Sequence, residues 1–192
     1  MKRIMRNRVK QPYFVLSAGC GLGKEAMSVV ITWHRLLKEY AVAEKDFPLI
    51  VIALDAAREN LDAIKNWQSL WLTTTDLEQA CYDLADFFVL DETMRIRPLP
   101  HTMAPIHTTQ INLLEPGQVL ELKDFTPNGR GFNAIFCHSV TMYYKSDEAM
   151  ILATLQELLL PRAKPPSLLF HYNAGEQPIF ANLPGCPPKL RL

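Results

Sequence analysis

A continuous apolar run, Pro-Leu-Ile-Val-Ile-Ala-Leu at residues 48–54, constrains the fold of this chain more than any other feature. A strand with one face in water alternates apolar and polar residues, whereas an unbroken run is typical of a strand that is covered on both faces. Residues 13–18 and 167–172 have the same character. We therefore expect these segments to form a central sheet with helices on both of its faces.

Helical periodicity separates these strands, because apolar residues recur three and four positions apart in the segments between them. We expect Ser146 to cap the last helix, and Asp76 to cap one before it. Helices are predicted at residues 24–40, 57–72 and 147–160, and further strands at residues 109–114 and 133–140. Strands that alternate with helices indicate an α/β fold with a mostly parallel sheet and right-handed crossovers.

The 192 residues, of which 48% are hydrophobic, are enough for one domain with a substantial core. Three segments are expected outside that core. They are a basic tail at residues 1–11, an irregular insertion at about 91–108 and a proline-rich tail at 173–192. The insertion contains His101 and His107, which we interpret as exposed loop histidines, with substrate contact or a metal pair as the alternative.

Charge and cysteine content give no indication of a nucleic-acid, anionic-membrane or metal partner. Lys plus Arg and Asp plus Glu are 20 each, so the net charge of zero gives no indication of a nucleic-acid or anionic-membrane partner. The four cysteines have neither a CxxC pair nor metal-ligand spacing to a histidine, so we expect free thiols and no metal site. No apolar run is long enough to span a membrane, and we expect a cytoplasmic protein.

A glycine-rich turn, SAGCGLGKEAMS at residues 17–28, lies between the first strand and the first helix. It is no phosphate-binding P-loop, because Glu25 stands where that motif needs Ser or Thr. Its spacing is GxGxG, from Gly19 to Gly23, and a dinucleotide fingerprint needs GxGxxG. A nucleotide-binding oxidoreductase is a third, weaker alternative, because the chain lacks the GxGxxG motif of that class. The turn suits a ligand that approaches the backbone closely without a pyrophosphate.

Polar residues gather where the predicted strands end. Asp55 follows the second strand, where a carboxylate can accept hydrogen bonds from both hydroxyls of a ribose; its alternative role is to cap the next helix. Asn112 and the segment 137–144 lie at the ends of two more strands. Because ligands of parallel sheets bind at the carboxyl ends of the strands, we expect one site to unite these residues.

These segments resemble the class I S-adenosylmethionine-dependent methyltransferases, and among them the CheR family of chemoreceptor glutamate methyltransferases. SAGCGLGKEAMS is similar to that family's SA-x-C/A-x-TGEEPYS, and VIALD to its second strand ending in Asp. INLLEP resembles V-x-F-x-x-x-NLL, FNAIFCHSVTMYY resembles FDxIFCRNVxIYF, and LLLPRAKPPSLLF resembles LxPGGxLF. The segments keep the family's order over residues 13–172.

The resemblance implies a Rossmann-like class I methyltransferase fold, S-adenosyl-L-methionine as cofactor, and a protein or small-molecule methyl acceptor. Gly19, Cys20, Gly21 and Gly23 would form the turn beneath the methionine part of the cofactor, and Glu25 would reach its amino group. Asp55 would bind the ribose hydroxyls, and Asn112 and Leu113 would contact the adenine. His138 and Ser139 would lie beside the cofactor, and Tyr143, the predicted catalytic residue, near the transferring methyl.

The chain differs from the family pattern at a few positions. Asn133 replaces the Asp of FDxIF, and His138–Ser139 replaces an Arg–Asn pair. The family's N-terminal helical domain has no counterpart in the short segment before residue 13. Two alternatives therefore stay open beside an active methyltransferase. One is a non-catalytic binding module, and the other is a site that a partner subunit or domain completes.

Overall fold

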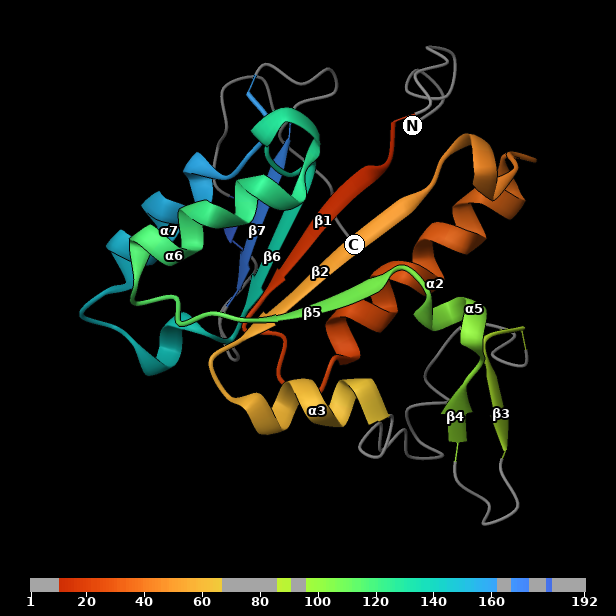
Figure 1. Cartoon of the computed structure of the whole chain (residues 1–192), viewed down its shortest axis with the longest axis horizontal. Coiled ribbons are helices and arrows are strands. Elements are labelled where there is room, and N and C mark those ends of the chain that lie inside the picture. The colour runs from red at the N-terminus through yellow and green to blue at the C-terminus, as the bar shows by residue number, and fades with distance from the viewer. Residues whose placement is uncertain (1–10, 67–85, 91–95, 162–166, 173–178, 181–192) are drawn as a thin grey trace.

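The computed structural model describes residues 11–66, 86–90, 96–161, 167–172 and 179–180. Its main sheet has six strands in the order β5-β2-β1-β6-β7-β8 (Figure 1). In chain order these strands are β1 (Tyr13–Ala18), β2 (Leu49–Asp55), β5 (Ile106–Gln110), β6 (Ala134–His138), β7 (Leu168–Tyr172) and β8 (Ile179–Phe180). A separate antiparallel hairpin pairs β3 (Phe88–Leu90) with β4 (Ile96–Pro98).

Five of the six main strands are parallel, and the chain reverses its direction of winding beside β1. From β1 it proceeds to β2 and β5 on one side, then crosses to β6 and β7 on the other. This is the strand order of Rossmann-like α/β folds, with a topological switch point between β1 and β6. The predicted fold class is confirmed. Part of the predicted C-terminal tail differs, because β8 extends the sheet antiparallel to β7.

The helices alternate with the strands as the periodicity predicts. The described helices are α2 (Lys24–Glu39), α3 (Arg58–Asn66), α5 (Pro100–Met103), α6 (Pro116–Leu120) and α7 (Glu148–Glu157). Short 3₁₀ turns connect them: η1 (Glu44–Asp46), η3 (Glu121–Phe125), η4 (Pro127–Gly129) and η5 (Thr141–Tyr143). The end of the predicted helix 57–72 and the helix expected after Asp76 lie outside the described residues.

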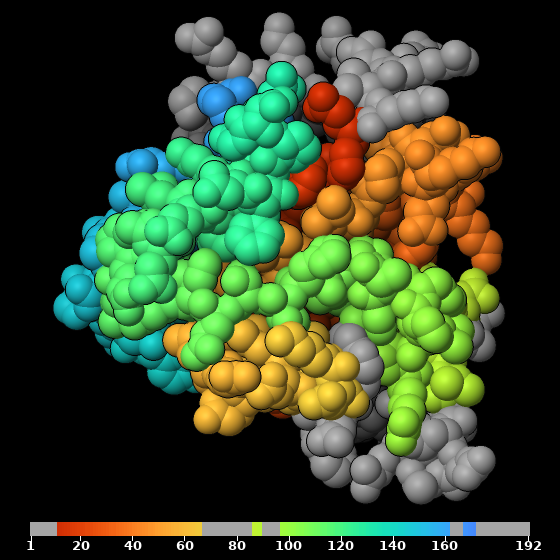
Figure 2. Space-filling model, in the orientation of Figure 1, coloured from red at the N-terminus to blue at the C-terminus, as the bar shows by residue number. Residues whose placement is uncertain are grey.

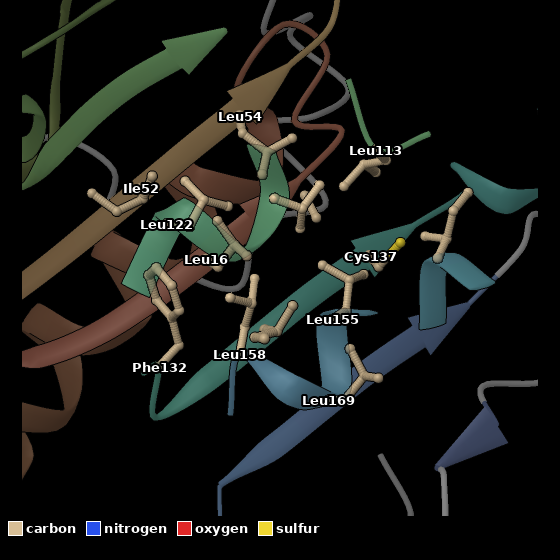
Figure 3. Packing of buried hydrophobic residues seen from close by; sticks show 14 of the residues in the cluster. Leu16, Ile52, Leu54, Leu113, Leu122, Phe132, Cys137, Leu155, Leu158 and Leu169 are labelled. Atoms are coloured by element: carbon tan, nitrogen blue, oxygen red, sulfur yellow. The ribbon is translucent and has the colours of Figure 1, made fainter. Parts of the chain in front are cut away.

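Alternation along the strands divides the core into two layers. On one face, Leu16, Ile52 and Ile135 pack with Leu155 and Leu158 from α7 and its end (Figure 3). A second set of buried residues from α2, α3 and the opposite face of the strands forms the other layer: Val15, Val51, Ala53, Ala26, Val30, Leu61 and Ile64. Because both faces of β1 and β2 are buried, these strands lack a polar alternation, which explains their continuous apolar sequence.

The strand predicted at 109–114 is displaced. β5 is Ile106–Gln110, so residues 106–108 belong to the sheet rather than to an irregular insertion, and the chain leaves the sheet at Ile111. Ile111, Leu113 and Leu114 pack into the α7-side core from a loop. These residues are thus apolar because they pack into the core, although they do not pair with a strand. Figure 2 shows β5 as the surface edge of the sheet, above α3 in that view.

The helix predicted at 147–160 is shorter, and its cap differs. Asp147, not Ser146, occupies the N-cap position; the Ser146 hydroxyl donates to Asp147 Oδ2 at 2.7 Å and makes no cap bond. The helix ends at Glu157, because the next residues pair with the chain before β6. The Leu160 N–H donates to Phe132 O at 2.8 Å, and the Phe132 N–H to Leu158 O at 2.8 Å.

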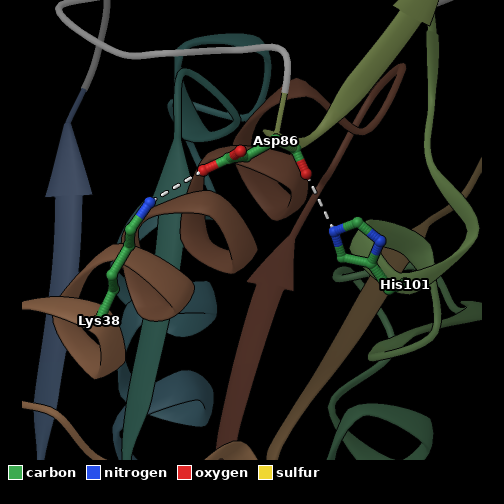
Figure 4. Close-up of polar contacts among 3 residues, drawn as sticks. All are labelled: Lys38, Asp86 and His101. Atoms are coloured by element: carbon green, nitrogen blue, oxygen red, sulfur yellow. Dashed lines mark hydrogen bonds and ion pairs between the residues drawn. The ribbon is translucent and has the colours of Figure 1, made fainter.

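The two insertion histidines have different positions. His101 lies on α5, where its Nε2 is 3.0 Å from the Asp86 carbonyl oxygen, and Lys38 Nζ of α2 lies 3.2 Å from Asp86 Oδ2 (Figure 4). His107 is an exposed residue of β5. No group of three potential metal ligands occurs among the described residues. None of the helices in that part of the chain combines the length and apolarity needed to cross a bilayer.

Candidate functional site

A cavity of about 390 Å³ lies at the carboxyl ends of β1, β2 and β6, beside the switch point. It is called the crevice below. The residues predicted for the cofactor that line it are Gly19, Gly21, Asp55, Asn112, Leu113, His138 and Ser139, and the predicted catalytic residue Tyr143 also lines it. These residues come from four chain segments, so the structure brings together most of what the sequence analysis expected in one place.

The glycine turn is held against β2 by its backbone. The N–H groups of Gly19 and Cys20 both donate to Leu54 O, at 2.9 and 2.8 Å. Gly19 has φ +71°, and a Cβ there would lie 2.3 Å from Cγ2 of Val140. Glycine is therefore required at this position for two reasons. The backbone is left-handed, and the loop after β6 approaches too closely for a Cβ. Gly21, with φ +51°, faces open space.

Asp55 joins the glycine turn to the start of α3. The Gly21 N–H donates to Asp55 Oδ2 at 2.8 Å, and the Ala57 N–H donates to Oδ1 at 2.9 Å. The carboxylate thus accepts the N–H of the residue before α3 and also lines the crevice. Each carboxylate oxygen has a second lone pair with which to accept a ligand hydroxyl.

The segment after β5 forms another wall of the crevice. Asn112 Oδ1 accepts the Leu114 N–H at 3.0 Å, and the Asn112 carbonyl oxygen accepts the Glu115 N–H at 3.0 Å. These bonds fix a tight turn just before α6. Leu113 in that turn is buried and presents an apolar surface to the crevice. The wall thus combines one amide side chain with the aliphatic residues Ile111 and Leu113, a composition suited to a heteroaromatic ring.

The loop after β6 closes the opposite side. Ser139 has φ +57°, an uncommon conformation for a residue other than glycine. Such strain persists only where the surroundings enforce it, and it clusters at functional sites. His138 is exposed at the strand end, and Tyr143 is 76% exposed on η5. The wall formed by this loop is therefore open to solvent.

Cys20, Gly23 and Glu25 are predicted cofactor residues that do not line the crevice. Cys20 is buried under the turn, where burial and then the Asp55 charge raise the pKa of its thiol to about 12. Gly23 has φ +82° and begins α2 against Ile64. Glu25 turns to the other face of the sheet, where it accepts a 2.6 Å hydrogen bond from the Ser17 hydroxyl.

A buried polar cluster lies behind the crevice, and the sequence analysis did not predict it. The Thr141 hydroxyl donates to Glu148 Oε1 at 2.8 Å and lies 2.7 Å from His171 Nε2, which is itself 3.3 Å from Glu148 Oε1. Thr141 and His171 are buried, so these contacts tie η5 to α7 and β7. The sequence signal for this cluster is His171, a polar residue that follows the apolar run LLF in β7. Asn133 has a similar structural role, since its Oδ1 accepts the Phe14 N–H at 2.8 Å.

Comparisons with known proteins give matches only among solved structures. Neither a protein-family model nor a curated protein matches the chain. The glycopeptide N-methyltransferase MtfA complexed with (S)-adenosyl-L-methionine matches with 13% identity and a TM-score of 0.46 over 88% of this chain. Its complex with sinefungin, also at 13% identity, and the citrinin polyketide synthase CMeT domain, at 11%, each match with a TM-score of 0.43 over 88% of this chain.

The chain spans only part of each matched structure. It covers 50% and 46% of the two MtfA chains and 31% of the chain with the CMeT domain.

Proposed function

We propose that the crevice binds S-adenosyl-L-methionine and that the protein is a methyltransferase. The observation that carries this proposal is the meeting, at the switch point, of the glycine turn, Asp55 and the Asn112–Leu113 wall. A parallel sheet binds its ligand at this place. The three parts have the chemistry that the sulfonium amino acid, the ribose and the adenine of this cofactor each require.

Each part has a separate role in binding. The open backbone at Gly21 leaves room for the methionine portion of the cofactor. Asp55 accepts the ribose hydroxyls with the lone pairs that Gly21 and Ala57 leave unused. Leu113 packs on the adenine, and Asn112 donates from its Nδ2, because its Oδ1 already accepts the Leu114 N–H.

The finer proposal is a CheR-like reaction with a carboxylate acceptor. The acceptor oxygen attacks the methyl carbon in line, the carbon–sulfur bond breaks, and its electron pair stays on the sulfur. The protein contributes alignment and exclusion of water. A carboxylate is already ionised at neutral pH and needs no general base, so it makes the least demand on this site. Tyr143 and His138, at the solvent-facing rim, would then position the acceptor.

Isothermal titration with S-adenosylhomocysteine tests the cofactor proposal. We expect micromolar binding by the wild-type protein, and Asp55→Ala to weaken it by about 2–3 kcal/mol, because a charge-assisted pair of hydrogen bonds is lost. Asp62→Ala is the matched control, since Asp62 only contacts Arg58 on the exposed side of α3, at 3.7 Å. Unchanged binding by Asp55→Ala would contradict the pocket assignment.

A binding module that transfers no methyl group is the second candidate, because Tyr143 is 76% exposed and this wall does not exclude water unaided. Incubation with methyl-labelled S-adenosylmethionine and carboxylate-bearing protein acceptors separates the two functions. Label in a base-labile ester supports the methyltransferase. Cofactor binding with no label transferred to any acceptor supports the binding module, or a site that a partner subunit completes.

A further inference from the structure

A second cavity, of about 570 Å³, lies on the face of the sheet opposite α7. It is called the aromatic cavity below, and it shares no described lining residue with the crevice. Its floor is formed by β1, β6 and β7 and its side by α2. The residues that the argument uses are Tyr13, Glu25, Thr32, Trp33, Phe136 and Phe170.

Among the described residues, the helices that pack on this face of the sheet, α2 and α3, lie beside β1 and β2. On β6 and β7, Phe136 and Phe170 stack with ring centroids 4.7 Å apart but remain only partly buried. Both rings line the cavity, so an apolar ligand within it can be buried against them.

The wall on the α2 side is also aromatic and is held in place. The Tyr13 and Trp33 rings stack with centroids 5.0 Å apart, and the Trp33 Nε1–H donates to Phe47 O at 3.1 Å. With its polar group bonded, the indole presents only its apolar surface. A preformed cavity of several hundred cubic ångströms with aromatic walls is typical of small-molecule sites.

One ionisable group lines this apolar cavity. Glu25 accepts the Ser17 hydroxyl with Oε1 at 2.6 Å, and burial raises the pKa of its carboxyl to about 7, against the opposing effect of that hydrogen bond. The nearby thiols of Cys20 and Cys137 have pKa values raised to about 12 by burial and by negative charges, and the pKa of Tyr13 is also raised. At pH 8, Glu25 is therefore the charged group among these titratable neighbours.

We propose that the aromatic cavity binds a cationic amphiphile, an organic molecule with an aromatic or aliphatic body and one ammonium group. The body packs against Trp33, Phe136 and Phe170, and the ammonium pairs with the Glu25 carboxylate. Charge complementarity selects this class, because a neutral apolar ligand leaves the carboxylate desolvated with only the neutral Ser17 hydroxyl beside it, and an anion is repelled by it. The ammonium supplies a cationic partner at short range.

Three probes of matched shape test the proposal by isothermal titration at pH 8: 2-(1-naphthyl)ethylamine, 2-(1-naphthyl)ethanol and 1-naphthylacetate. We expect the amine to bind roughly tenfold more tightly than the alcohol, and the acetate more weakly than both. Glu25→Gln keeps the acceptor for Ser17 and removes the charge, so the amine should lose its advantage. Glu59→Gln, the same change in the first turn of α3, should retain it.

Two further measurements identify where the probe binds. Thr32 is an exposed α2 residue at the cavity, so Thr32→Trp should fill the entrance and abolish binding of all three probes. S-adenosylhomocysteine should not displace the amine, because the crevice is a separate site. Displacement by that compound, an amine preference that survives Glu25→Gln, or the absence of any binding would each overturn the proposal.

The aromatic cavity could alternatively be filled by a second copy of the chain, and sedimentation detects that case. If sedimentation shows a dimer that Thr32→Trp dissociates, the aromatic cavity is an interface between copies and the proposal is wrong. A monomer that binds the amine supports it. Because binding of the three naphthyl probes is measured without the cofactor, a failure of the amine to bind leaves the proposed methyltransferase function unaffected.

Discussion

At the scale of single residues, the glycines of the turn after β1 make different demands. We predict that Gly19→Ala lowers the free energy of unfolding by about 2–4 kcal/mol, because a left-handed alanine is strained and its Cβ would lie 2.3 Å from Val140 Cγ2. Gly21→Ala should cost only about 1–2 kcal/mol, since strain is its only penalty there. Urea denaturation of the two variants measures this difference.

A double variant checks the cause. In Gly19→Ala with Val140→Ala, both Val140 methyl groups that meet the new Cβ are absent, so the two substitutions together should cost less than the sum of their separate effects. Strict additivity would mean that the contact between the turn and the loop after β6 is not what makes Gly19 necessary.

Glu25 gives a pH dependence with a definite sign. Burial raises the pKa of its carboxyl in the folded protein from 4.5 to about 7, so between those values the unfolded chain binds fewer protons. Stability should therefore fall as pH rises from about 4.5 to about 7. Glu25→Gln removes the effect, and we expect that variant to match the wild type near pH 5 and to exceed it by about 2–3 kcal/mol at pH 8.

Unfolding free energies at several pH values between 5 and 8 test this prediction, with Glu59→Gln as the control that should show no such divergence. A constant difference between wild type and Glu25→Gln across that range would contradict a buried carboxyl at this position.

At the scale of elements, the buried cluster of Thr141, Glu148 and His171 fastens η5 to α7 and β7. We predict that Thr141→Val destabilises the protein by about 1–3 kcal/mol, because buried polar groups lose a hydrogen-bond partner. Thr154→Val is the control, since the Thr154 hydroxyl bonds only to Met150 O within its own helix, at 2.9 Å. Equal losses in the two variants would show that the cluster has no special role.

Sequence periodicity located most elements but not all of their boundaries. The strands at 13–18 and 48–54 and the helix at 24–40 were predicted nearly to the residue, because their apolar patterns reflect burial on fixed faces. β5 begins three residues and ends four residues before the predicted strand, since Ile111 and Leu113 are apolar because they pack into the core from a loop. A pattern of burial cannot by itself distinguish a strand from a loop that enters the core.

At the scale of the whole molecule, strand order explains why the sequence alone could predict which residues line the crevice together. Residues after β1, β2, β5 and β6 are distant in sequence, but parallel pairing brings those strand ends to one edge of the sheet. The orientation of Glu25 could not be predicted in this way. It depends on the Ser17 hydroxyl and on which face of α2 is turned to the sheet, and both are set by tertiary packing.

Amide chemical shifts during titration with S-adenosylhomocysteine test the cofactor site most directly, because they report which residues the ligand reaches. We predict shifts at Gly19, Gly21, Asp55, Asn112 and Ser139, which line the crevice from separate segments of the chain. Their absence at millimolar ligand, or shifts confined to the aromatic cavity around Phe136 and Phe170, would contradict S-adenosylmethionine binding at the switch point.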